Sequence, residues 1–443
     1  MMNHPEYAAR LGRLRRLRAA LEKYEPAFYE AFEQDFGKGR FETYTTEIGY
    51  VLTAIRHTER RLRRWMRPRK VATPLVLFPA RSRVYPEPYG RVLVIGPFNY
   101  PLNLTIAPLA AALAAGNTVT LKASRQTPAV SARIAEMLRE IFPPDVVEVV
   151  SPDVSNDELL ARRYDYIFFT GSPRVGRIVM EAAAKHLTPV TLELGGKSPA
   201  IVTATAPLRL ACERIARGKF LNAGQTCVAP DYVLVHASVR DAFIAEMRKV
   251  IQEYFGDISR RPADMTLIAQ KRHWERIMGL IDPAKVVIGG TGDATTRYIA
   301  PTVLDRVSWS DEVMQEEIFG PVLPVLTYSD LETEVIAKVR AGEKPLSLYI
   351  FSRNRREIRK VLREISFGGG CVNDTVMHLG NENLPFGGVG NSGIGAYHGR
   401  TGFETFSHFK SVLHKSSCSW LNFDLLKPPY KDRLLRLVRR VCR

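Results

Sequence analysis

The sequence predicts an α/β protein built on parallel sheets. Short apolar runs that suit buried strands alternate with longer stretches whose apolar residues recur every three or four positions, which is typical of helices. The clearest unit runs from a strand at Val92–Ile95 through the turn Gly96–Asn99 and an alanine-rich helix over 102–115 to a strand over 118–121. This order forms a βαβ unit with two parallel strands. The composition, with 45% hydrophobic and 25% charged residues, is that of an ordinary globular protein.

The N-terminal quarter is predicted to be mainly helical. Residues 5–36 and 44–66 carry apolar side chains at helical spacing, for example at Leu14 and Leu17. Three prolines then interrupt the chain, and residues 71–88 alternate between apolar and polar side chains. Because proline cannot donate a hydrogen bond within a sheet, this segment suits an edge hairpin or an arm rather than a central strand.

The alternation of strands and helices continues towards the C-terminus. A second βαβ unit is predicted over 129–185, and it contains the strand Tyr166–Phe169 followed by Thr170–Gly176. Further helices are expected near 207–221, 238–255 and 331–341, then an aromatic, extended segment over 401–426 and a basic helix from Lys431 to Arg443.

The net charge of +17 lies mostly at the two ends of the 443-residue chain. Residues 1–70 and 409–443 each carry +7, which leaves +3 for the body. Such ends could meet an anionic surface, or they could serve solubility alone. A nucleic-acid interface would need aromatic side chains interleaved on one basic face, and the sequence has no such pattern, so no nucleic-acid partner is expected.

The cysteines and the apolar runs indicate an intracellular, cytoplasmic protein. Five widely spread cysteines form no CxxC pair, which argues against a disulfide framework and a zinc site, so no metal is expected. No unbroken apolar run reaches the roughly 18 residues of a membrane span. Residues 1–10 contain no apolar stretch of the kind that a secretory signal requires.

Cys227 is the candidate nucleophile among the cysteines. It follows Asn222-Ala223-Gly224-Gln225-Thr226, a small and polar stretch in which a thiol is approachable. The alternative is a buried structural cysteine, the commoner state of a free thiol. Cys212 and Cys371 fit that alternative well.

Glu193 and Asn99 are the candidates for proton transfer and for oxyanion binding. Glu193 stands between two leucines at the end of a β-rich run, so it lies either on an exposed face or in an apolar pocket that would raise its pKa. Taken alone, the pattern favours the exposed face. Asn99 follows the first predicted strand of the sheet, where a side-chain amide can donate to an oxyanion or simply form a turn.

The glycine-containing loop 171–176 opens a predicted helix, and helix N-termini bind phosphate. The loop lacks the GxGxxG fingerprint of dinucleotide-binding folds, and a plain helix entry explains it equally well.

Taken together, these motifs resemble those of the aldehyde dehydrogenase superfamily along nearly the whole chain. The segments Gly393–Gly399 and Phe403–His408 are similar to its class 3 branch, which includes dimeric and fatty-aldehyde enzymes. Six motifs carry the resemblance, and they occur in the order of the family: Gly96–Pro101, Phe169–Ser172, Leu192–Pro199, Gly224–Cys227, Glu316–Pro321 and Pro385–Gly388.

The resemblance implies an α/β fold with a Rossmann-like parallel-sheet cofactor domain, an α/β catalytic domain and a small β oligomerisation arm. The cofactor domain would span 1–194, with 67–88 as the arm, and the catalytic domain 195–398. An oligomerisation strand and tail would cover 399–426, and a basic amphipathic segment 427–443.

The resemblance also assigns a reaction, the oxidation of an aldehyde to a carboxylic acid with NAD or NADP. Cys227 would attack the aldehyde, Asn99 would bind the oxyanion, and Glu193 would activate the water that hydrolyses the thioester. Aromatic, medium-chain and long-chain aldehydes all remain open as substrates. A CoA-acylating dehydrogenase and a non-catalytic basic binding protein on the same fold are the alternatives.

For the cofactor, the resemblance points to residues at three places in the chain. One departure concerns Arg125, because the family commonly has Lys-Pro-Ser-Glu where this chain has Lys122-Ala123-Ser124-Arg125. An arginine can pair with the 2′-phosphate of NADP, whereas a glutamate would repel it. The expected cofactor residues are Lys122, Arg125, Gly171, Ser172, Gly176, Glu317 and Phe319.

A homodimer is the expected assembly, by resemblance to the class 3 branch. The basic segment 427–443 carries seven lysine and arginine residues, and it could contact an anionic membrane surface or pack on a neighbouring subunit.

Overall fold

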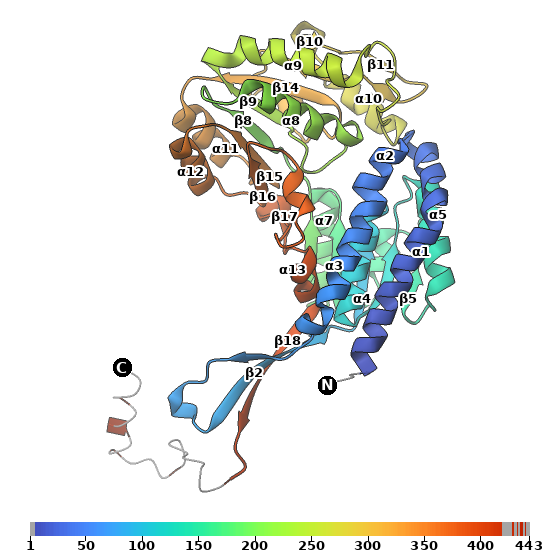
Figure 1. Ribbon diagram of the computed structural model, residues 1–443, viewed down its shortest axis with the longest axis vertical. Helices are drawn as coiled ribbons and strands as arrows, with labels where there is room; N and C mark the ends of the chain where they lie inside the picture. The colour runs from blue at the N-terminus through green and yellow to red at the C-terminus, as the bar shows by residue number, and fades with distance from the viewer. Residues whose placement is uncertain (1–4, 419–427, 429–431, 433–434, 437–438, 440–443) are drawn as a thin grey trace.

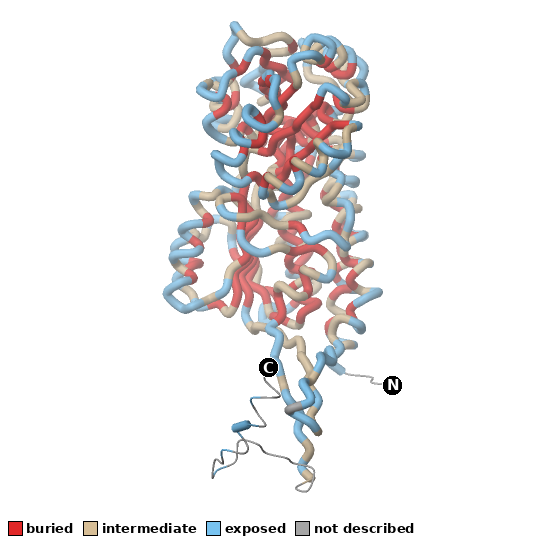
Figure 2. The backbone as a smooth tube through the Cα atoms, turned by 90° about the vertical axis from the view of Figure 1, so that its left-hand side faces the viewer, coloured by how far each residue is buried: buried red, intermediate tan, exposed pale blue. Residues whose placement is uncertain are grey.

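The computed structural model describes residues 5–418 and five single positions beyond them, 428, 432, 435, 436 and 439. It contains two large, mostly parallel sheets and a slender antiparallel arm that projects from the body (Figure 1). This arrangement confirms the predicted α/β class with parallel sheets. The buried residues run through both large sheets, whereas the arm is coloured mainly as exposed or intermediate (Figure 2).

A helical layer precedes the first sheet. Helix α1 (Pro5–Phe36) has the predicted bounds, and its apolar face is buried. The predicted helix over 44–66 is divided instead into a π-helical segment, η1 (Tyr44–Ile48), and α3 (Gly49–Trp65), after the short α2 (Arg40–Thr43). Such π-helical segments occur mostly as single-turn features and frequently at functional sites.

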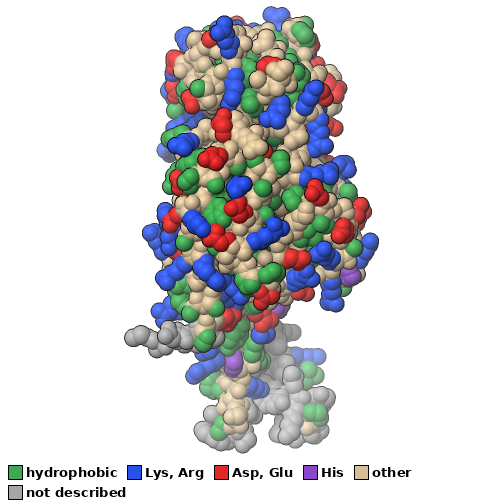
Figure 3. Space-filling model, turned by 90° about the vertical axis from the view of Figure 1, so that its right-hand side faces the viewer, with side chains coloured by type: hydrophobic (Ala, Val, Ile, Leu, Met, Phe, Trp, Pro, Cys, Tyr) green, Lys and Arg blue, Asp and Glu red, His purple; other side chains and the backbone are tan. Residues whose placement is uncertain are grey.

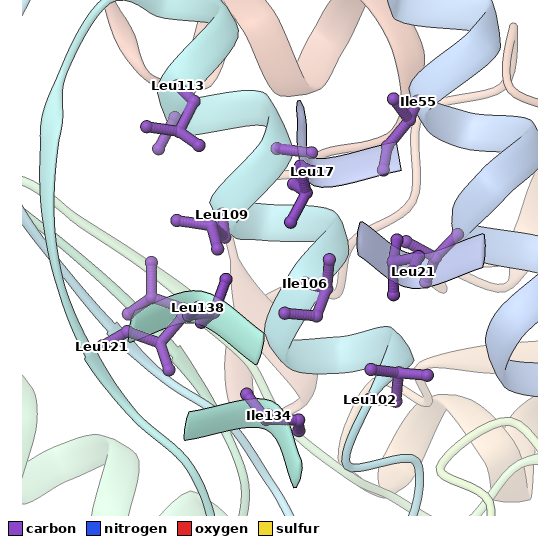
Figure 4. Close-up of a cluster of buried hydrophobic side chains, with 14 of the residues drawn as sticks. Leu17, Leu21, Ile55, Leu102, Ile106, Leu109, Leu113, Leu121, Ile134 and Leu138 are labelled. Carbon is purple, nitrogen blue, oxygen red and sulfur yellow. The ribbon is translucent and has the colours of Figure 1, made fainter. Parts of the chain in front are cut away.

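The first sheet has the order β17-β7-β6-β3-β4-β5, and only the short β17 is antiparallel to its neighbour. Alternate side chains of a strand point to opposite faces, so Val92 and Val94 pack under α1, α3, α4 and α5, while Leu93 and Ile95 pack towards α6 and α7. Figure 4 shows part of the first of these cores, with Leu17 and Ile106 among the side chains drawn. The elements are β3 (Arg91–Ile95), α4 (Asn103–Ala115), β4 (Thr118–Lys122), α5 (Pro128–Ile141), β5 (Val147–Val149), α6 (Asn156–Leu160), β6 (Tyr166–Thr170), α7 (Pro173–Ala184), β7 (Val190–Glu193) and β17 (Gly393–Ile394).

The second sheet has the order β10-β13-β14-β9-β8-β15-β16 and is parallel except for β10. Helices α8 and α9 cover one face, and α10, α11 and α12 lie on the side of the other core. Its elements are β8 (Pro199–Val202), α8 (Leu208–Phe220), β9 (Tyr232–His236), α9 (Arg240–Phe255), α10 (Lys271–Gly279), β10 (Val286–Ile288), β13 (Thr302–Leu304), β14 (Val322–Tyr328), α11 (Ala337–Ala341), β15 (Ser347–Phe351), α12 (Arg355–Glu364) and β16 (Gly369–Val372), with the small hairpin β11 (Gly292–Asp293) and β12 (Tyr298–Ile299) beside them.

The arm consists of three antiparallel strands. Strand β2 (Ala80–Pro88) pairs with β1 (Arg69–Val71) on one side and with β18 (Ser407–Lys415) on the other. The predicted arm is therefore confirmed as a hairpin, and a strand from the other end of the chain completes it.

Two expectations for the C-terminal region need separate comment. The prediction of an extended segment over 401–426 is wrong at its start, because Gly399–Thr405 form the helix α13. Phe403 of this helix is buried against the first core. Most of 427–443, including the predicted helix from Lys431, lies outside the described residues. No described helix has the length and apolar character needed to cross a membrane.

Candidate functional site

Four strands of the first sheet deliver their carboxyl ends to one edge of that sheet. The turn with Asn99 follows β3, and Gly171–Ser172 follow β6, whereas Lys122 and Glu193 are the last residues of β4 and β7. Ligands of open α/β sheets bind at this edge, beyond the strand ends. The fold thus explains how candidates far apart in the sequence come to lie at one edge.

Asn99 is joined directly to the loop that carries Cys227. Its side-chain amide donates to the Gln225 carbonyl at 3.0 Å, and its own carbonyl accepts from the Asn222 side chain at 2.9 Å. The next residue, Tyr100, shares a 2.6 Å hydrogen bond with the hydroxyl of Thr226. The turn after β3 and the cysteine loop are therefore one hydrogen-bonded unit.

The cysteine loop has a strained backbone. Asn222 and Ala223 have φ values of 54° and 52°, a conformation that is costly for residues with a Cβ atom. Gly224 follows at φ 73°, where a Cβ atom would lie 2.3 Å from the Gly320 carbonyl oxygen. Strain of this kind persists only where the surroundings enforce it, and it gathers at active sites. Here it presents a half-buried Cys227.

Glu193 lies in a buried pocket, so the expectation of an exposed face is wrong. The residue is 3% exposed, and neither carboxyl oxygen has a hydrogen-bond partner among the described residues. Burial raises the pKa of Glu193 well above its ordinary value. A carboxyl group with this environment can act as a base near neutral pH.

The Cys227 thiol shares its surroundings with two carboxyl groups. Burial raises the pKa of Cys227, and the charges of Glu317 and Glu193 raise it further. Burial also raises the pKa of Glu317 to about 8, with a contribution from Asp231. The carboxyl of Glu317 lies so close to Gly195 that a Cβ atom there would be 2.1 Å from its Oε2. Cys227, Glu193 and Glu317 thus belong to one electrostatic site.

Lys122 and Arg125 place two cations at the end of β4. The Lys122 ammonium donates to Asn156 Oδ1 at 2.8 Å, and its pKa is lowered by burial and by the charge of Arg125. Arg125 is exposed, and it has no ion pair within the described part of the chain. Two adjacent cations that destabilise one another favour an anionic ligand.

The loop after β6 forms the N-terminus of α7. Ser172 is the N-cap, and its hydroxyl accepts from the Val175 N–H at 3.4 Å. The Gly171 N–H donates to the Glu193 carbonyl at 3.0 Å, which ties this loop to the end of β7. Gly176 packs against Leu194, where a Cβ atom would meet the leucine side chain at 2.8 Å. These contacts account for the conformation of the loop. The binding of a cofactor by this loop stays a prediction.

Phe319 belongs to an aromatic group beside the turn after β3. Its ring meets Phe98 edge-on at 5.7 Å, and Phe98 stacks on His273 of α10 at 5.1 Å. His273 also contacts the Gln126 side chain at 3.0 Å. The structure therefore brings Phe319 near the first turn and links α10 to the residue that follows Arg125.

Several residues of this site escaped the sequence analysis. The Asn222 side chain donates hydrogen bonds to the carbonyls of Asn99 and Gln225. Tyr397 lies in the same electrostatic environment as Glu193 and Cys227. Lys38, Glu42 and Glu47, from the N-terminal helical layer, lie beneath the cysteine loop. Only Asn222 had a visible signal, since Asn before Ala-Gly suits a left-handed turn. No group of three or more His, Cys, Asp or Glu in the described residues could hold a metal ion.

A family model, curated relatives and a solved structure all match this chain over more than nine-tenths of its length. Residues 2–412 match the family model described as the aldehyde dehydrogenase family. A 4,4'-diaponeurosporen-aldehyde dehydrogenase of Staphylococcus aureus (strain NCTC 8325 / PS 47) is 47% identical over 95% of this chain and 92% of its own length. A dimeric NADP-preferring aldehyde dehydrogenase of Canis lupus familiaris is 42% identical over 97% of this chain and 94% of its own. The substrate-bound structure of Staphylococcus aureus AldH superposes with a TM-score of 0.95 at 45% identity, covering 98% of this chain and 94% of that one.

Proposed function

The chain belongs to the aldehyde dehydrogenase family, and from that premise we propose that Cys227, Asn99 and Glu193 carry out its reaction. The protein is an NAD(P)-dependent oxidoreductase that acts on aldehydes. The observation that carries the residue assignment is the buried Glu193 carboxyl, whose oxygens lack partners among the described residues and whose charge acts on the Cys227 thiol.

Cys227 would form the covalent intermediate. The Cys227 thiol releases its proton to solvent, and the resulting thiolate attacks the aldehyde carbon. The carbonyl oxygen becomes an oxyanion, and the product is the anion of a thiohemiacetal. The side-chain amide of Asn99 has a second N–H besides the one bound to Gln225, and this N–H would stabilise the oxyanion. Removing one such donor typically costs about 10²–10³ in rate.

The residues at the sheet edge fit a dinucleotide. The cation pair Lys122 and Arg125 offers charge for phosphate or ribose groups, and Glu317 has a buried carboxyl for a hydroxyl donor. When bound, the dinucleotide supplies the acceptor for the hydride that leaves the thiohemiacetal carbon. Cys227 is then left as a thioester.

Glu193 would complete the cycle. Its carboxylate takes a proton from water, the resulting hydroxide attacks the thioester carbon, and the carboxylic acid leaves as the thiol of Cys227 is restored. The raised pKa of Glu193 makes it a stronger base than an exposed glutamate. A base separate from the nucleophile is needed because the cysteine is acylated at this stage.

Two variants test this assignment. We expect Cys227→Ala to lose aldehyde oxidation. We expect Glu193→Gln to accumulate an acyl adduct on the peptide that contains Cys227, measured by intact mass and peptide mapping after mixing with aldehyde and cofactor. Retained turnover in Cys227→Ala, or an acyl group on another residue, would refute the assignment.

The substrate is proposed to be an aromatic or a medium- or long-chain aliphatic aldehyde. The Staphylococcus aureus relative is named for 4,4'-diaponeurosporen-aldehyde, and this name describes that protein. Steady-state rates across a chain-length series of aldehydes, with benzaldehyde as the aromatic member, would define the preference. A preference for two-carbon aldehydes would contradict the proposal.

The first alternative is transfer of the acyl group to CoA instead of water. A buried base at Glu193 favours hydrolysis, and stimulation of NADH or NADPH formation by CoA would favour the alternative. The second alternative, a non-catalytic basic binding protein, gains little support from the surface. Basic and acidic side chains are interspersed over the face drawn in Figure 3.

We also propose a cytoplasmic location and a peripheral role for segment 427–443. The proposed chemistry needs a reduced thiol, and the four described cysteines are free. The seven basic residues of the segment would each contribute about 1 kcal/mol of attraction near an anionic lipid surface. Co-sedimentation with phosphatidylserine vesicles, with and without residues 427–443, tests the contact. Equal partitioning of both forms would exclude it.

A further inference from the structure

A buried group of charged side chains lies beneath the cysteine loop. Lys38 stands between α1 and α2 with its side chain fully buried, and Glu47 of η1 is fully buried as well. The ammonium nitrogen of Lys38 is 3.8 Å from Glu42 Oε1 and 3.8 Å from Glu47 Oε1. It also lies 4.7 Å from the centre of the Tyr100 ring, within the range of a cation–π interaction.

Two connections lead from this group to the loop. In the first, Glu42 Oε1 accepts the backbone N–H of Asn222 at 2.8 Å, and Asn222 is the first of the strained residues before Cys227. In the second, the Tyr100 hydroxyl is bonded to Thr226, the neighbour of Cys227. Both ends of the loop thus depend on side chains that face one ammonium group.

The charged atoms of this group are buried and incompletely paired. The Lys38 Nζ and one oxygen of Glu47 have no hydrogen-bond partner among the described residues. Burial raises the pKa of Glu47 to about 7, against the opposing charge of Lys38. Removing one member of a buried ion group leaves an uncompensated charge, so the members are expected to be strongly coupled.

We propose that Lys38 is a positioning residue for the nucleophile, acting through Glu42 on Asn222 and through Tyr100 on Thr226. The inference rests on the proposed role of Cys227. Without the ammonium group, Glu42 and Glu47 face one another as two acids. The cation–π contact that helps to hold the Tyr100 ring is also lost. The loop then no longer holds the sulfur and its backbone N–H in one geometry.

The test measures the thiol itself and not turnover. We expect Lys38→Met to slow the alkylation of Cys227 by iodoacetamide by about tenfold or more, with the extent of alkylation measured by peptide mapping. We also expect the pH midpoint of alkylation to rise, because the net charge beside the loop becomes more negative. The groups that already act on this thiol, Glu193, Glu317, Tyr100, Tyr349 and Tyr397, are unchanged in the variant.

A second substitution separates positioning from stability. Adding Glu47→Gln to Lys38→Met removes the uncompensated acid, and we expect it to return the rate and the midpoint towards the wild type. Arg10→Met is the matched control, because Arg10 of α1 is also a buried cation but bonds to the Ala114 carbonyl and to Glu6, away from the cysteine loop. We expect the control to alkylate within about twofold of the wild type despite reduced stability.

The outcomes decide the inference in either direction. Wild-type alkylation in Lys38→Met, equal slowing in Arg10→Met, or no recovery in the double variant would overturn it. If Lys38→Met does not fold, Tyr100→Phe, which keeps the ring and removes only the bond to Thr226, decides the question by the same readout. Activity retained by Cys227→Ala would refute the proposed function, whereas the alkylation result would still report on Lys38.

Discussion

At the scale of single residues, burial decides what each candidate can do. Glu193 shows this most clearly, because its neighbours in the sequence favoured an exposed face whereas the fold encloses it at 3% exposure. The sequence identifies the residue type and its place at a strand end. The packing that excludes water and raises its pKa comes from β17, β6 and other segments distant in the chain. Sequence patterns alone therefore predicted the wrong environment for Glu193.

Arg125 carries a prediction at the same scale. Its exposed guanidinium lies beside Lys122, so we expect NADP to be accepted, because the 2′-phosphate gains a charge-assisted partner. Arg125→Glu should lower kcat/KM for NADP by about tenfold or more, roughly 1.4 kcal/mol, and change the value for NAD much less.

Steady-state kinetics with both cofactors provide the measurement. Arg356→Glu, the same charge change at an exposed position of α12, is the control. A wild-type preference for NAD above about tenfold would contradict the expectation.

At the scale of elements, the βαβ pattern predicted where the candidates lie. The strands at 92–95 and 166–169 and the helix at 102–115 agree with β3, β6 and α4 within one residue at every end. Parallel pairing then carries Asn99 and Glu193 to one edge of the sheet. The η1 segment was not predicted, because a π-helical turn keeps nearly the same apolar spacing as the α-helix that surrounds it.

The cysteine loop shows the limit of prediction at this scale. Its small and polar residues indicated an approachable thiol, and the half-buried Cys227 agrees with that expectation. The left-handed conformations of Asn222 and Ala223 depend on contacts with Asn99, Glu42 and Gly320. None of these neighbours is close in the sequence, so the shape of the loop is a tertiary property.

At the scale of the whole molecule, the arm carries large apolar side chains that no other segment of the described chain covers. Strands β1, β2 and β18 project from the body (Figure 1), and Leu75 and Phe78 at its tip are 89% and 66% exposed. Large exposed apolar side chains that gather on one feature mark an interaction site. We propose that a second copy of this chain covers the arm, as the predicted homodimer would require.

The dimer can be tested on the arm directly. We expect sedimentation velocity to give a dimer for the wild type and a shift towards monomer for the variant Leu75→Ser with Phe78→Ser, because the apolar contact is removed. Leu187→Ser is the control, since Leu187 is 90% exposed on the body. A monomeric wild type, or a variant that dimerises as the wild type does, would contradict the proposal.

The sequence by itself determined the α/β class, the order of the main strands and helices, the arm and the family. These follow from local periodicity, from proline positions and from short motifs, all of which act between residues close in the chain. Only the tertiary structure decided that Glu193 is buried, that β18 completes the arm, and that Lys38 lies beneath the cysteine loop. The burial and the charged neighbours of a residue depend on segments that lie hundreds of residues apart in the sequence. No local pattern specifies which of these segments come together.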